Sequence, residues 1–198
     1  MAHGRHGNPS DVTRMVRRQL QRGRAAWQKP ERVLRALQLG RGSVVADVGA
    51  GPGFWTLPLA RRVGARGRVF ALDPEPLALQ TLRRRLAQAR IRNVTPVLND
   101  DGSPMLPEAA CDLAVMVNVY HHFASPAEFL RRVARCLKPG GRLANIDWVD
   151  RDTPKGPPAH RRISPKVFLR DARRAGLALV EEHRFLPYQY FVVLRRAR

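Results

Sequence analysis

The sequence predicts an α/β fold in which a mainly parallel sheet is covered by helices on both faces. Short apolar segments alternate with amphipathic ones, a glycine-rich turn follows the first apolar segment, and segment 113–117 is apolar throughout. A continuous apolar run is typical of a strand that is buried on both sides. The 198 residues are enough for one domain with a substantial core, and no internal repeat indicates a second domain.

Strand and helix patterns follow one another from residue 44 onward. Short apolar runs predict strands over 44–48, 69–72, 94–98, 113–117 and 142–148. Helical spacing of apolar residues predicts helices over 56–63, 75–89 and 127–137. Ser164 and Pro165 open a last helix, which Gly176 ends. Strands that alternate with helices in this way form a parallel sheet.

The segment 44–56, VVADVGAGPGFWT, is the most informative part of the chain. A short apolar run that contains Asp47 is followed by three alternating glycines, Gly49, Gly51 and Gly53, before a helical pattern begins. Glycine permits a sharp turn and a close approach of a ligand to the backbone, and the helix after the turn presents unpaired amides. The segment therefore predicts a nucleotide-binding turn at the end of the first strand.

The spacing of the glycines distinguishes two kinds of cofactor. Dinucleotide-binding folds use GxGxxG, in which the last glycine lets the helix pack closely on the strand. Here Phe54 occupies that last position, and the third glycine stands one residue earlier. The spacing GxGxG behind an acid resembles the first motif of the class I S-adenosylmethionine (SAM) methyltransferases. The resemblance implies SAM as the cofactor, and as its binding residues Asp47, Gly49, Ala50, Gly51 and Gly53.

A second acid, Asp73, ends the next apolar run, RVFALD, about 20 residues beyond the glycines, as the nucleotide-binding layout requires. A carboxylate at the end of the second strand can accept hydrogen bonds from both ribose hydroxyls. Alternatively, Asp73 is the N-cap of a helix that starts at Pro74. The two roles are compatible because the carboxylate has two oxygens. We expect Asp73 and Pro74 at the cofactor.

The likeness to class I methyltransferases extends over almost the whole chain. The blocks CDLAVMVNVYHHF and LKPGGRLANIDW resemble the family's fourth and fifth strands, and AAWQKPERVLRAL resembles the lead-in of bacterial type 11 methyltransferases. The resemblance implies a Rossmann-like class I methyltransferase fold with a mostly parallel seven-stranded sheet. It divides the chain into a helical lead-in (1–40), a cofactor-binding core (41–149), a linker or lid (150–163) and a last helix with closing strands (164–198).

The resemblance also implies where the rest of the cofactor lies. Adenine should lie between the second and fourth strands, near Asn99, Asp100, Asp101 and Gly102. One of the two adjacent acids is expected to accept the exocyclic amine, and Asp101 is the choice. In the lead-in, Trp27 and Gln28 are expected to cover the methionine end. The alternative for Trp27 is that it packs the first helix onto the sheet.

The fourth strand is followed by Asn118, Val119, Tyr120 and His121. Methyltransferases that act on base amines carry an NPPY-like tetrapeptide there, and both of its prolines are missing here. The segment YHHF is closer to the LHH-like segment of small-molecule methyltransferases. We expect Asn118 at the cofactor, and Tyr120, His121 and His122 as catalytic candidates, with one histidine as a general base. The alternative is that the histidines only shape the loop.

The expected reaction is direct displacement, in which a nucleophile of a small-molecule acceptor attacks the sulfonium methyl group in line. No metal is expected, because neighbouring histidines without a matched carboxylate or third ligand make a poor site. Two alternatives remain open: an RNA (rRNA or tRNA) methyltransferase, and a SAM-binding protein without catalysis. Cys111 and Cys136 stand in apolar patterns and are expected to be packed thiols.

The net charge of +20 and the pI near 11.7 make a nucleic-acid partner possible. However, 32 of the 36 basic residues are arginines, and they are spread over every predicted helix. This ratio fits a GC-rich codon composition as well as phosphate binding, so nucleic acid is not favoured. The chain begins without an apolar signal core, and no apolar run is long enough to span a bilayer. We expect a cytoplasmic protein without membrane association; the oligomeric state stays open.

Overall fold

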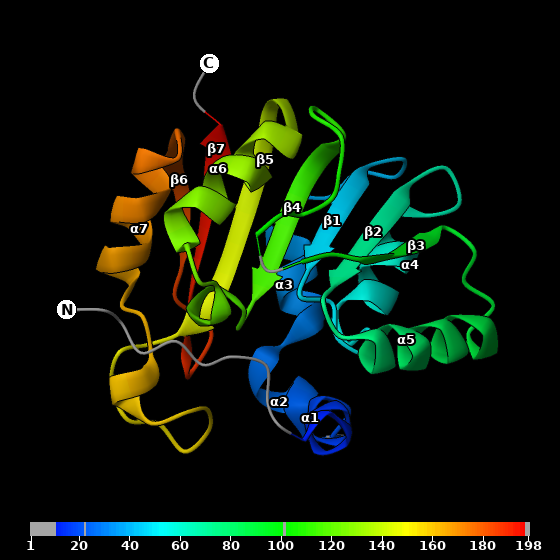
Figure 1. Ribbon diagram of the computed structural model, residues 1–198, viewed down its shortest axis with the longest axis horizontal. Coiled ribbons are helices and arrows are strands. Elements are labelled where there is room, and N and C mark those ends of the chain that lie inside the picture. Colours follow the sequence, from blue (N-terminus) through cyan, green and yellow to red (C-terminus); the bar gives the residue numbers. More distant parts are fainter. Residues whose placement is uncertain (1–10, 22, 101, 197–198) are drawn as a thin grey trace.

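A seven-stranded sheet runs through the middle of the computed structural model, which describes residues 11–21, 23–100 and 102–196 (Figure 1). Its strands are β1 (Val44–Val48), β2 (Arg68–Asp73), β3 (Val94–Leu98), β4 (Cys111–Val117), β5 (Leu137–Trp148), β6 (Leu177–His183) and β7 (Gln189–Arg196). Their order is β3-β2-β1-β4-β5-β7-β6, and β7 is antiparallel to both of its neighbours. The expected Rossmann-like, mostly parallel seven-stranded sheet is confirmed.

Helices cover both faces of this sheet, as Figure 1 shows. One face carries α3 (Pro30–Ala36), α4 (Thr56–Val63) and α5 (Pro76–Gln88), and the other carries α6 (Pro126–Cys136) and α7 (Pro165–Arg174). Successive residues of β4 serve the two cores in turn: Leu113 and Val115 pack with α3 and α4, whereas Ala114 and Met116 pack with α6 and α7. This double burial explains why the strand is apolar throughout.

Short elements complete the chain at the carboxyl ends of the parallel strands. The helices α1 (Val12–Gln19) and α2 (Arg24–Gln28) lie at this edge, and α1 packs against α5 (Figure 1). Two short 3₁₀ helices are η1 (Tyr120–His122), directly after β4, and η2 (Ala159–Arg161) in the connection to α7. No helix in the described ranges is both long and apolar enough to cross a membrane.

The largest differences from the sequence-based expectation are at the start of the fifth strand and in the lead-in. The fifth strand, expected over 142–148, begins at Leu137, because this residue already pairs with Cys111 before a bulge shifts the register. The preceding helix accordingly ends at Cys136. The lead-in is divided at Lys29, whose left-handed conformation (φ 47°) ends α2 directly before Pro30 begins α3.

Candidate functional site

The glycine turn lies at the carboxyl end of β1, where the sequence predicts it. Gly49 and Gly51 both have positive φ angles, 71° and 54°, which favour glycine over residues that carry a Cβ. A Cβ on Gly49 would clash with the side chain of Val119, which follows β4. On Gly51 it would clash with the amide oxygen of Gln19, the last residue of α1. The turn therefore lies tightly between the post-strand segment and the N-terminal helix.

Asp73 holds the glycine turn in place from the end of β2. Its Oδ2 accepts a hydrogen bond from the Gly51 N–H at 2.7 Å, and its Oδ1 accepts one from the Glu75 N–H at 2.9 Å. The N-cap interpretation of Asp73 is wrong: the helix begins at Pro76, after Pro74, and Glu75 caps it by accepting from Leu77 N–H. The sequence DPEP contains two acid–proline pairs, and the second one opens the helix.

Asp47 is buried at the end of β1 and connects the strand to α4. Its Oδ2 accepts a 2.6 Å hydrogen bond from the Thr56 hydroxyl. The pKa of Asp47 is raised to about 7, mainly by burial and also by the charge of Asp73, while the Thr56 bond and the charge of Arg24 act in the opposite direction. The site therefore contains a carboxylate whose charge responds to its surroundings near neutral pH.

Arg24 joins the N-terminal helices to the glycine turn, although no local pattern in the sequence marks it. Its Nε donates to Gln28 Oε1 at 2.5 Å and its Nη1 donates to Gln19 O at 3.1 Å. The guanidinium carbon lies 4.3 Å from the centre of the Phe54 ring. Burial lowers the pKa of Arg24 to about 10, against the opposing effect of the Asp47 carboxylate. The arginine thereby holds α1 and α2 over the turn.

The two lead-in residues expected at the cofactor have different surroundings. Gln28 is fully buried, and its Nε2 has no hydrogen-bond partner among the described residues. Such a buried donor has a high cost unless a ligand or water accepts from it. Trp27 packs against two aromatic side chains, with ring centroids 5.2 Å from Trp148 and 6.1 Å from Tyr188. Its contacts are those of a packing residue, and they attach α2 to the sheet.

The loop after β3 carries the candidates for adenine. Asp100 is engaged with its own loop, since its Oδ1 accepts from the N–H groups of Gly102 and Ser103 at 2.8 and 2.6 Å. Asn99 is buried and donates to the carbonyls of Asp100 and Ser103. The residue chosen for the adenine amine, Asp101, lies outside the described residues.

The candidate site residues in the segment after β4 have different surroundings. Asn118 has a positive φ of 58°, and its Oδ1 accepts from Gln189 Nε2 at 2.7 Å. Tyr120 is completely buried, and its hydroxyl donates to Asp171 Oδ2 at 2.8 Å. Burial, together with the carboxylate of Asp171, raises the pKa of Tyr120. The ring also packs edge-on against Phe168, so the structure gives Tyr120 a core position instead of the expected catalytic one.

His121 lies beside a carboxylate that the sequence pattern did not indicate. Its Nδ1 is 3.5 Å from Oδ1 of Asp147, which stands near the end of β5. Both side chains are buried, with 9% and 2% of their surface exposed. Asp147 Oδ1 also accepts from the Trp148 N–H at 2.8 Å, while its Oδ2 has no partner in the described part of the chain. The ring of His122 lies 4.1 Å from that of His121.

The expectation that the histidines lack a matched carboxylate is therefore wrong, because Asp147 is 26 residues away in the sequence but adjacent in space. The arrangement is a histidine–carboxylate pair and offers only two potential metal ligands. In the described ranges, no cluster of three or more His, Cys, Asp or Glu side chains could hold a metal ion.

Comparison with known proteins agrees with this geometry. A family model described as a methyltransferase domain matches residues 45–141. The crystal structure of a SAM-dependent methyltransferase from Aquifex aeolicus superposes with a TM-score of 0.90 at 26% sequence identity, covering 96% of this chain and all of that one. The demethylmenaquinone methyltransferase of Listeria monocytogenes is 27% identical over 128 residues. Aklanonic acid methyltransferase DauC of a Streptomyces strain is 28% identical over 130 residues.

Each of these two alignments covers 65% of this chain, which spans 53% of the Listeria protein and 59% of DauC. The match with the Aquifex structure includes the N-terminal helices and the closing strands, whereas the family model covers only β1 to the start of β5. The fold, the glycine turn with its two acids and these similarities agree: residues 45–141 match a methyltransferase domain, and the chain has the fold of a SAM-dependent methyltransferase.

Proposed function

We propose that this protein binds SAM over the glycine turn and transfers its methyl group to a small-molecule acceptor at the ends of β4 and β5. The observation that carries the proposal is the hydrogen bond from Gly51 N–H to Asp73, because it fixes the glycine-rich turn next to a carboxylate suited to a ribose. The names of two relatives support a small-molecule acceptor, since one acts on demethylmenaquinone and the other on aklanonic acid.

The residues around the turn fit this cofactor. Asp73 would accept from the ribose hydroxyls, and the backbone of Gly49 to Gly51 would approach the ligand closely. Gln28 Nε2 is a buried donor without a partner in the described ranges, which suits the carboxylate at the methionine end. Asp47 would support the cationic end of the ligand from below the turn. When bound, SAM supplies a methyl group that is already strongly electrophilic.

His121 is proposed as the general base for acceptors with a hydroxyl or another protonated nucleophile. Its Nδ1 faces Asp147, so the other ring nitrogen, Nε2, is the one that can accept a proton from the acceptor. The Asp147 carboxylate would favour the tautomer with a proton on Nδ1 and would stabilise the imidazolium that forms. The separation of 3.5 Å is longer than a hydrogen bond, as is common before a substrate is bound.

The experiment that tests the proposal is calorimetry with S-adenosylhomocysteine, followed by a screen for methyl transfer from SAM to hydroquinones and polyketide acids. We expect binding of the cofactor product and turnover with at least one acceptor of these classes. Absence of binding would contradict the whole assignment. Binding without turnover on any small molecule, but with methylation of rRNA or tRNA, would favour the RNA methyltransferase, and binding without any turnover would favour a non-catalytic protein.

A further inference from the structure

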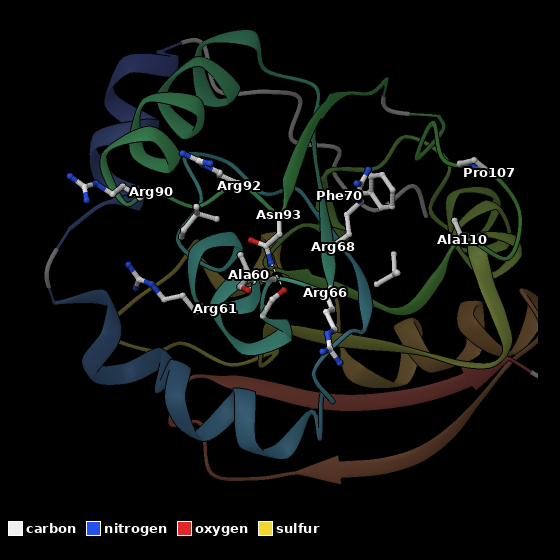
Figure 2. A pocket seen from close by; sticks show the side chains of 15 residues that line it. Ala60, Arg61, Arg66, Arg68, Phe70, Arg90, Arg92, Asn93, Pro107 and Ala110 are labelled. Atoms are coloured by element: carbon white, nitrogen blue, oxygen red, sulfur yellow. Dashed lines mark hydrogen bonds between the residues drawn. The ribbon is translucent and has the colours of Figure 1, made fainter.

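A groove of about 770 Å³ lies at the amino ends of the parallel strands, at the opposite edge of the sheet from the glycine turn (Figure 2). Its lining includes the first residues of β1 and β2, Val44 and Arg68, and Asn93, which directly precedes β3. The Asn93 side chain donates to the carbonyls of Ala60 and Gly64, both at 2.9 Å. These bonds tie the end of α4 to the start of β3, so the groove is built on fixed backbone.

Five exposed arginines are the polar feature of this groove: Arg61, Arg66, Arg68, Arg90 and Arg92. Figure 2 shows them around Asn93, with Arg61, Arg90 and Arg92 toward one side and Arg66 and Arg68 toward the other. The lining contains no acidic residue, and none of the five arginines forms an ion pair within the described ranges. The groove therefore carries uncompensated positive charge.

The part of the chain that supplies these five arginines contains few acids. Residues 61–92 contain nine arginines and only two acids, Asp73 and Glu75. Both acids lie at the far end of the sheet, where Asp73 holds the glycine turn and Glu75 caps α5. Elsewhere, some of the arginines are paired with acids, as in the contacts of Arg131 with Glu128 and of Arg184 with Glu182. The five arginines of the groove therefore share a lining that contains no acid.

The chemistry of the groove suits a chain of phosphates with attached bases. Guanidinium groups bind phosphate oxygens through paired N–H donors. Phe70 is half-buried, and its ring forms part of the groove wall beside Arg68 (Figure 2). Proteins that bind single-stranded nucleic acids combine aromatic rings with basic side chains, because the bases stack on the rings and the basic groups neutralise the phosphate backbone. A concave groove fits a single nucleic-acid strand better than it fits the flat surface of a membrane.

We propose that this groove is a docking site for single-stranded RNA, separate from the site of methyl transfer. The five residues of β1 separate the two sites by roughly 17 Å at about 3.3 Å per residue. RNA in the groove is therefore a partner of the protein and need not be its methyl acceptor. RNA binding depends mainly on the charge of the RNA phosphate backbone. It should therefore show little preference for sequence and should weaken strongly as the salt concentration rises.

The test is fluorescence anisotropy with a labelled 12-nucleotide oligouridylate over a series of salt concentrations. The double variant Arg66→Gln/Arg92→Gln should bind about tenfold more weakly or worse, and the slope of log K against log salt should fall by about 1.4, which corresponds to two lost phosphate contacts on a single strand. The matched control is Arg173→Gln/Arg174→Gln in α7, which removes the same charge from exposed positions away from the groove. It should change binding by less than about twofold. Equal losses in both variants would overturn the proposal in favour of diffuse charge.

A second comparison identifies the ligand class. Phe70→Leu should weaken RNA binding by about fivefold or more, since a stacking ring is lost, and should leave the binding of inorganic polyphosphate unchanged. If polyphosphate or vesicles with anionic lipid displace RNA at equal charge, and Phe70→Leu changes neither affinity, the groove is a general anion site and the RNA proposal is wrong. Thermal melting and S-adenosylhomocysteine binding of each variant control for folding, because the cofactor turn lies at the other edge of the sheet.

Discussion

The imidazole of His121 faces the buried carboxylate of Asp147 at 3.5 Å, across the ends of two neighbouring parallel strands. The two residues come from separate segments, one from the 3₁₀ helix after β4 and the other from β5. This pairing separates the roles of the two adjacent histidines: the one next to the carboxylate is the proposed base.

His121→Ala should lower turnover by roughly 10²- to 10⁴-fold, while the affinity for S-adenosylhomocysteine hardly changes, because a general base acts on the acceptor and not on the cofactor. His122→Ala is the matched control and should retain most of the activity. Single-turnover kinetics and calorimetry measure the two quantities. The wild-type rate should also rise with pH, since only neutral imidazole accepts a proton. Near-normal turnover in both variants, with a flat pH profile, would eliminate the base.

Asp147→Asn should reduce kcat by about 10- to 100-fold with little change in KM, because it removes the charge that orients the imidazole and stabilises its protonated form. A positioning role also predicts that the pH dependence of kcat is altered, which a purely structural role would not do. Asp171→Asn serves as the control, since Asp171 accepts from the core residue Tyr120 and does not contact His121. An unchanged pH profile in Asp147→Asn would argue that the pair has only a packing role.

Asp73→Ala should weaken S-adenosylhomocysteine binding by on the order of 1.5 to 3 kcal/mol, because the turn loses its carboxylate anchor and the ligand loses a charge-assisted acceptor. Gly51→Ala should weaken binding as well, since its Cβ would clash with Gln19 in a backbone conformation that favours glycine. Gly140→Ala is the control for backbone strain, because Gly140 also has a positive φ (77°) but open space around it. Of the two glycine variants, calorimetry should show weakened binding for Gly51→Ala and unchanged binding for Gly140→Ala. Equal effects of the two glycine variants would refute a specific role of the turn.

The free energy of unfolding should depend on pH through Asp47, whose pKa is raised to about 7, mainly by burial. A carboxyl group with a raised pKa holds its proton more tightly in the folded state. Its contribution to stability is therefore complete below its ordinary pKa near 3.8 and is lost as the pH rises to about 7 and above.

Asp47→Asn keeps an oxygen that can accept from Thr56 but has no charge to bury. Between pH 4.5 and 8, the melting temperatures of the wild type and of Asp47→Asn should diverge. At the higher pH, the melting temperature of the variant should rise relative to that of the wild type. Parallel pH curves for the two proteins would show that Asp47 is ionised in both the folded and the unfolded state.

Arg162→Ala should loosen the connection between β5 and α7, which the sequence leaves as either a lid or an ordinary connection. The buried guanidinium donates to four carbonyls of this connection and its preceding strand end, those of Val149, Arg151, Lys155 and Pro157. We expect a loss of about 2 kcal/mol in unfolding free energy and faster proteolysis in segment 150–163. Arg161→Ala, at an exposed neighbour, should have little effect. If Arg162→Ala instead alters KM for the acceptor without changing stability, the segment acts as a lid.

The sequence predicted those parts of the fold and of the site that depend on nearby residues. The glycine turn, the acids Asp47 and Asp73 and the apolar strand before Asn118 were all recognisable because their partners lie within a few residues or in the next strand. The helix start at Pro76 was placed too early, at residue 75 by the apolar spacing and at Pro74 by the N-cap interpretation of Asp73, because two acid–proline pairs compete for it. The early start of β5 was missed because proline and two glycines there have the appearance of a turn.

The remaining parts of the site depend on distant contacts that no spacing encodes. Asp147 reaches His121 only because β5 lies next to β4, and Arg24 reaches Asp47 only because the N-terminal helices fold back over the turn. The one available signal for Asp147 was that it is the only acid in the strand end ANIDW. Tyr120 could not be separated from the histidines by sequence, since its burial depends on the packing of α7.

The position of β3 at the free edge of the sheet has a consequence for how copies of this chain can meet. The carbonyl of Asn93 accepts from Val69 in β2, so the backbone polar groups of alternate residues, including position 96, face outward from the sheet. That position is Pro96, which has no N–H to offer to another strand. If a strand of a second molecule paired with β3, the hydrogen bond from position 96 would be missing in the middle of the new ladder. Pro96 thus protects this edge against growth into strand-paired aggregates.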